Sequence, residues 1–351
     1  AVEMAIDTNP SAKAADSRIK IAEAKIRESA AGRKPFAQFS QSVVGSNNPV
    51  FVFGSLLEQG RFGPSNFSID SLNKPDGLVN FRSQFNAQMP LFDQRQTRAR
   101  VSQAEIGKKQ AELMADAARQ KLRFDVVRSF YGVILGREMI KVSDDAIGSA
   151  EANRKKVSDM VDVGMTTEAD LLAADLEVAN AGQRKIEAES QLVNTLASLN
   201  ITIGTAADLD RRLAGELREK FFPVQDQAEL IRLALEDRPD YPRLLLDLEN
   251  SRLRSQAVRD THLPRVDAFG NVGYSSPYIT NGSTDYTVGV NLTYTLFDAG
   301  RKARTEQAVE GETLAGLERD NLANQIRLDV IRAFQAFKTA DAKIRVSIKS
   351  I

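Results

Sequence analysis

The chain has 351 residues, of which 42% are hydrophobic and 27% charged, and its 47 basic side chains balance 47 acidic ones. Cysteine is absent and His262 is the sole histidine, which excludes disulfides, thiol nucleophiles and metal sites built on thiolates. A net charge of zero offers no basic field for nucleic acid. We therefore expect no metal, no cofactor and no nucleic-acid partner, and the scattered carboxylates predict no enzyme.

The first quarter of the chain predicts a helix and then a β-hairpin. An Ala- and charge-rich stretch runs from Pro10 to Pro35 and is typical of a helix. Over residues 36–91 the pattern changes to a two-residue alternation, which predicts a hairpin whose long external loop is formed by residues 45–80. The apolar members of its second strand are Phe81, Phe85, Met89 and Leu91.

Residues 94–200 predict a long antiparallel helical hairpin. The stretch before Gly164 contains no proline and would form a rod of roughly 100 Å. Thr166 or Thr167 then provides an N-cap for the returning helix. Residues 201–223, with Gly204, Gly215 and Pro223, predict a small lateral segment that closes the first part of the chain.

The second part of the chain, residues 224–351, repeats this order. It predicts a helix over 240–262, a β-hairpin over 265–297 and a long helix over 301–351. Three landmarks of the first part recur in the same sequence: the pair of prolines, a Leu-Phe-Asp triplet, and a helical stretch, residues 122–130, that matches 326–334. We therefore expect two tandem repeats, 1–223 and 224–351. The sequence patterns at both ends of the chain are typical of the interior of a helix, and we expect both ends to have been trimmed.

The four predicted strands have the length and alternation of tilted membrane-spanning strands. One row on the last strand is apolar throughout and consists of Tyr286, Val288, Val290, Leu292 and Tyr294. Four strands cannot close a barrel, and open edges are not tolerated in lipid. Three chains would give a shared barrel of twelve strands. The alternative is a soluble periplasmic coiled-coil scaffold that buries this row in its own core.

In the order and spacing of these features the sequence resembles the outer membrane efflux protein family, the TolC-like channel-tunnels of Gram-negative bacteria. The residues that carry the resemblance are the tandem repeat, the start of the second hairpin at Leu263-Pro264, and the two triplets at which the hairpins end. These exit triplets are Leu91-Phe92-Asp93 and Leu296-Phe297-Asp298, the second of which continues to Gly300.

The resemblance implies a mixed α and β fold in which a homotrimer joins a twelve-stranded barrel in the outer membrane to a long α-helical barrel in the periplasm. It also implies that the turn Val163-Gly164-Met165 is a tip that docks on a periplasmic adaptor, and that Asp170 is a gating candidate. The implied function is a passive exit duct of a tripartite efflux or type I secretion system, whose partners are the adaptor, an inner-membrane pump and outer-membrane lipid.

Overall fold

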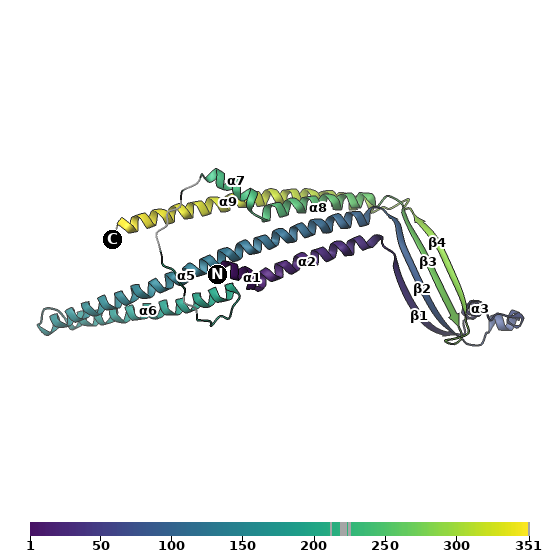
Figure 1. The fold of residues 1–351 in the computed structure, drawn as a ribbon, viewed down its shortest axis with the longest axis horizontal. Coiled ribbons are helices and arrows are strands. Elements are labelled where there is room, and N and C mark those ends of the chain that lie inside the picture. The colour runs from purple at the N-terminus through teal and green to yellow at the C-terminus, as the bar shows by residue number, and fades with distance from the viewer. Residues whose placement is uncertain (211–212, 218–222, 224–225, 350–351) are drawn as a thin grey trace. The chain divides into compact units, whose positions relative to one another are not determined.

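The computed structural model describes residues 1–210, 213–217, 223 and 226–349. Along the chain (Figure 1) the elements are α1 (Val2–Thr8), α2 (Pro10–Ala30), η1 (Ala31–Arg33), β1 (Phe36–Ser46), α3 (Pro49–Glu58), η2 (Pro64–Phe67), α4 (Ile69–Asn73), β2 (Leu78–Asp93), α5 (Gln96–Asp162), α6 (Glu168–Ile203), α7 (Gln227–Asp237), α8 (Asp240–Asp260), β3 (Arg265–Ser276), β4 (Ser283–Thr293) and α9 (Arg301–Lys349).

The chain divides into two compact units by its internal contacts. The first unit contains residues 1–21, 109–245 and 319–351, and the second contains residues 22–108 and 246–318. Each unit draws on both halves of the chain, so this division by packing does not follow the predicted repeats 1–223 and 224–351, which stay a prediction. The predicted lateral segment 201–223 and the last residues of the predicted helix 301–351 lie partly outside the described residues.

The second unit contains a four-stranded antiparallel sheet in the order β1-β2-β3-β4. Its register places Phe39, Phe85, Val272 and Tyr286 side by side across the four strands. All four side chains are at least half exposed. The opposite face carries Gln84, Asn86 and other polar side chains. The sheet therefore has one exposed apolar face and one polar face, as the alternation predicts.

The alternation on β2 is interrupted near its end, where the sequence prediction is wrong. A β-bulge lies between Pro90 and Phe92, so that Phe92 rather than Leu91 pairs with Val266. The extra residue reverses the side that each following residue faces. The strict two-residue alternation of Phe81, Phe85 and Met89 therefore does not extend unbroken to Leu91, because Phe92 occupies the position that pairs with Val266. Other predicted ends also differ: the helix expected over 240–262 ends at Asp260, and the hairpin expected over 265–297 ends at Thr293.

The segment between β1 and β2, predicted as a loop, contains the helices α3 and α4. Asn48 begins α3 as its N-cap, and its side chain accepts hydrogen bonds from the backbone N–H groups of Val50 and Phe51. Edge-to-face contacts join Phe62 to Phe53 and Phe67, with ring centroids 4.9 and 5.0 Å apart. The segment is thus a small packed subdomain rather than an extended loop.

In the first unit, α5 and α6 form the predicted antiparallel helical hairpin. Glycines allow them to approach closely, since a Cβ added at Gly132 would lie 3.0 Å from Thr195 Cγ2 and one at Gly136 would lie 3.2 Å from Leu192 Cδ1. Nearer the turn, Lys185 Nζ lies 2.7 Å from Asp144 Oδ1 across the pair. Close packing near one end and ion pairs toward the other therefore set the register of the hairpin.

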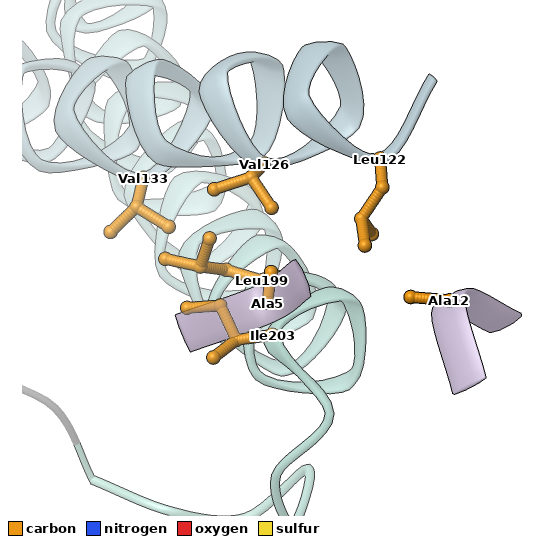
Figure 2. Packing of buried hydrophobic residues seen from close by; sticks show 7 residues of the cluster. All are labelled: Ala5, Ala12, Leu122, Val126, Val133, Leu199 and Ile203. Atoms are coloured by element: carbon orange, nitrogen blue, oxygen red, sulfur yellow. The ribbon is translucent and has the colours of Figure 1, made fainter. Parts of the chain in front are cut away.

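The core of the first unit lies where α1, α5 and α6 meet (Figure 2). Val126 and Val133 of α5 contact Leu199 and Ile203 of α6, and Ala5 of α1 lies among them; each is at most 2% exposed. These apolar positions recur along each helix at the spacing that one helix face requires. Among the described helices, none is both long and apolar enough to cross a membrane.

Candidate functional site

The turn between α5 and α6 is built by the hydrogen bonds of a glycine C-cap. Helix α5 ends at Asp162, and Gly164 has a φ of +72°. The N–H of Gly164 donates to Val161 O at 2.9 Å, and the N–H of Met165 donates to Met160 O at 2.8 Å. These are the two bonds of a Schellman motif, in which glycine accepts the left-handed conformation without a steric penalty.

The turn presents apolar side chains to solvent. Val163 is 69% exposed and Met165 73% exposed, and Leu172 in the next turn of α6 is 71% exposed. A Cβ added at Gly164 would have no atom within 4 Å. The tip is therefore an apolar end with open space around it, which is the kind of surface on which another protein can pack.

Asp170 lies next to this tip and caps the start of α6. Its carboxylate accepts hydrogen bonds from the hydroxyls of Thr166 and Thr167, each at 2.6 Å, and from the Thr167 N–H at 3.0 Å. The N–H of Asp170 donates in return to Thr167 Oγ1, which completes a capping box. These bonds, that of the Thr166 hydroxyl first, lower the pKa of Asp170 to about 2. The gating role of Asp170 stays a prediction.

At the first exit triplet, Asp93 caps the long helix α5. It is buried, and its Oδ2 accepts a hydrogen bond of 2.7 Å from the N–H of Thr97. Gln94 and Arg95 both have positive φ, at 58° and 60°. The chain thus makes the abrupt turn from strand to helix with two non-glycine residues in the left-handed region, which costs free energy. Hydrogen bonds from Gln94 Nε2 to Thr261 O and Leu263 O hold this turn against the start of the second hairpin.

At the second exit triplet, Asp298 lies at the corresponding place before α9. Its Oδ1 accepts a hydrogen bond of 3.0 Å from the N–H of Gly300, and its Oδ2 pairs with Arg304. Leu296 and Phe297 follow the end of β4 and are 87% and 86% exposed. Each exit therefore has an aspartate that accepts a hydrogen bond from a nearby backbone N–H, within α5 for Asp93 and just before α9 for Asp298.

A charged cluster that was not predicted from the sequence lies at the other end of the sheet. Arg82 of β2 lies 3.0 Å from Glu58 of α3 and 3.2 Å from Asp285 of β4. Ser275 of β3 also donates to Glu58, at 3.3 Å. The signal available in the sequence was Arg82 itself, a charged residue in a strand whose other polar residues before Asp93 are Asn, Ser and Gln. Within the described part of the chain, no group of three or more His, Cys, Asp or Glu residues is arranged to hold a metal ion.

Comparison with known proteins decides the family. The sequence profile of the outer membrane efflux proteins matches residues 1–205 and 230–348. The chain belongs to the outer membrane efflux protein family. Its resemblance to that family is thereby confirmed, as are its location in the outer membrane of a Gram-negative bacterium and its large periplasmic part. The members of this family are channels rather than enzymes. Because the chain is located in the outer membrane, the alternative of a scaffold that does not span a membrane is not supported.

The chain is similar in sequence to the cobalt-zinc-cadmium resistance protein CzcC of Cupriavidus metallidurans. This relative is 26% identical over 194 residues, which cover 51% of this chain and 46% of the relative. The match thus spans about half the length of that relative.

Solved structures show the same fold at low sequence identity. The outer-membrane channel OprN superposes with a TM-score of 0.77 at 17% identity, covering 99% of this chain and 75% of that one. The CmeC outer membrane channel of Campylobacter jejuni gives 0.75 at 19% identity, covering 97% and 71%. The open state of the MtrE outer membrane channel of Neisseria gonorrhoeae gives 0.74 at 15% identity, covering 99% and 74%. The mixed helical and four-stranded fold of an efflux channel chain is therefore confirmed.

Proposed function

We propose that three copies of this chain form a passive exit duct that carries substrates from an inner-membrane pump to the outside of the cell. The observation that carries this proposal is the sheet: it has one exposed apolar face, and β1 and β4 lie at its edges. In an outer membrane the apolar face meets lipid, and the edge strands need partners because unpaired backbone groups are too costly in hydrocarbon. Neighbouring copies supply those partners, and three copies give twelve strands.

The polar face of the sheet then lines the lumen of the shared barrel. The helices of each copy continue the duct into the periplasm, where the tip Val163-Gly164-Met165 docks on a periplasmic adaptor. Support for docking comes from the exposed apolar side chains of the tip and from the open space around Gly164. The pump supplies the energy through the adaptor, and the duct itself performs no chemistry.

The substitution Gly164→Asp tests this proposal. It places a charge at the tip and a side chain on a left-handed backbone, so we expect it to abolish export while the trimer still assembles. The matched control is Gly148→Asp, which adds the same side chain to an exposed position of α5 with no atom within 4 Å. Export is measured as tolerance to the compounds whose toxicity increases when the gene is deleted from its host.

Light scattering in detergent gives the mass of each purified variant. A trimer of Gly164→Asp that restores full tolerance contradicts docking through this tip. A native protein that is monomeric without detergent contradicts the duct as a whole.

A further inference from the structure

The segment between β1 and β2, residues 47–77, presents two different faces through its helix α3. One face is buried: Val52, Ser55 and Gln59 recur at helical spacing and are 6%, 4% and 3% exposed. Figure 1 shows α3 beside the ends of the strands that are remote from the helices following the sheet. The segment therefore lies at the end of the sheet opposite the exits into α5 and α9.

The buried face of α3 is clamped to the polar face of the sheet. Besides the ion pair between Glu58 and Arg82, the side-chain amide of Gln59 donates to Val79 O at 3.1 Å and to Asn80 Oδ1 at 3.0 Å. A Cβ added at Gly60 would lie 3.4 Å from Ser283 Cβ on β4. The segment thus starts from β1 and reaches across the polar face as far as β4.

The opposite face of α3 is apolar and uncovered. Val50 is 81% exposed and Leu57 52% exposed, and Gly54 lies between them on the same side of the helix. A Cβ added at Gly54 would meet no atom within 4 Å, so the packing inside the copy does not require glycine there. Glycine in the middle of a helix is less stable than alanine, but it allows another chain to approach closely. Elsewhere in the segment, Phe67 and Ile69 are also apolar and are 67% and 78% exposed.

We propose that residues 47–77 form an external lid, in which the uncovered apolar face of α3 packs against the same face of the neighbouring copies. The inference rests on the proposed trimeric duct. In that duct the polar face of the sheet faces the lumen, so a segment clamped to it lies over the external mouth and away from lipid. The partner at that place is the same segment of the other copies, since rotational symmetry brings identical surfaces around one axis. Exposed apolar surface of this kind is otherwise unfavourable in a water-filled opening.

Because residues 1–351 contain no cysteine, single cysteines introduced there test the contact directly. Val50→Cys and Leu57→Cys are introduced separately, and the purified trimer is oxidised with copper-phenanthroline. We expect disulfide-linked pairs of chains on non-reducing gels for at least one of the two, because a disulfide needs Cα atoms within about 7 Å. The control is Tyr286→Cys on the apolar face of the sheet, which is 79% exposed and should form no such pairs.

A second experiment measures whether the segment closes the mouth. Ser40→Cys places a thiol on the polar face of β1, and a bulky, membrane-impermeant maleimide is added to whole cells. Adding Leu57→Asp brings like charges together at the lid contact, and we expect it to increase the labelling rate severalfold. Ile279→Asp is the control: it is 82% exposed on the turn between β3 and β4, outside the lid, and should leave the rate unchanged.

The outcomes separate this inference from the proposed function. Suppose that light scattering shows a trimer, that Leu57→Asp leaves the labelling rate of Ser40→Cys unchanged, and that neither Val50→Cys nor Leu57→Cys forms linked pairs. These results overturn the lid and leave the proposed duct in place. Equal acceleration by Ile279→Asp, or linked pairs for Tyr286→Cys, also overturns it. A native protein that is not a trimer overturns the proposed duct and the lid with it.

Discussion

Three aspartates in this chain lie at or near the starts of helices, at the points where the chain changes direction. Asp93 shortly precedes α5, Asp298 shortly precedes α9, and Asp170 closes the capping box of α6. In each case a carboxylate accepts a hydrogen bond from a backbone N–H at or just before the start of a helix, where negative charge is favoured. The sequence alone predicts that Thr166 or Thr167 caps α6, and the structure assigns this role to Thr167. The sequence does not predict that Gln94 and Arg95 adopt positive φ, since neither residue type favours that conformation.

The substitution Asp170→Asn tests the capping box and its dependence on pH. Because the pKa of Asp170 is lowered to about 2, the stability that its charge contributes is present above about pH 4 and is lost as the pH falls toward 2. Asparagine resembles the protonated carboxyl in shape. We expect the amides at the start of α6 to exchange faster in the variant at pH 6, and the difference to disappear on acidification.

Hydrogen exchange followed by mass spectrometry, corrected for intrinsic rates, measures this difference. Glu168→Gln is the control, because Glu168 lies in the same turn and outside the capping box. A difference that persists unchanged to pH 2 would show that the charge of Asp170 is not the cause.

At the scale of elements, the hairpin of α5 and α6 depends on close approach of the two helices. Gly132 and Gly136 leave room for Thr195 and Leu192, whereas Gly148, farther along α5, faces open space. The apolar periodicity predicts that the two helices pair, but it does not distinguish a glycine that the packing needs from one that it does not. That distinction depends on side chains about sixty residues away along the chain.

The substitution Gly132→Val is expected to destabilise the helical hairpin by about 1–3 kcal/mol, the usual cost of overpacking a close contact. Its Cβ would already lie 3.0 Å from Thr195 Cγ2, and the two further methyl groups add to the conflict. Gly148→Val is the matched control and should leave stability almost unchanged. Thermal unfolding followed by far-UV circular dichroism compares the two, and equal melting temperatures would contradict the packing argument.

At the scale of the whole molecule, the two faces of the sheet have different surroundings in the proposed barrel. Val288 and Thr287 are neighbours on β4, and both are exposed in a single copy. Val288 lies on the apolar face, and Thr287 lies on the polar face that lines the proposed lumen. Exposure within one copy does not distinguish them, whereas the environment in the membrane does.

The substitution Val288→Arg is expected to lower the free energy of unfolding in lipid vesicles by about 2–4 kcal/mol, the cost of a cationic side chain on the lipid face near the middle of the membrane. Thr287→Arg places the same side chain in the lumen and should cost little. Urea titration of the protein folded into phospholipid vesicles gives both values. An equal loss for the two variants would contradict the assignment of the faces.

The sequence alone predicts those features that depend on the pattern of residues close together along the chain. Alternation predicts the four strands, apolar periodicity predicts the long helices, and Gly164 predicts the end of α5, because each depends on neighbours a few residues away. The tertiary structure alone decided the bulge at Leu91, the helices within residues 47–77 and the clamp that joins Glu58, Arg82 and Asp285. These features depend on partners brought together from distant parts of the chain, and a single strand or loop contains no information about where its partners lie.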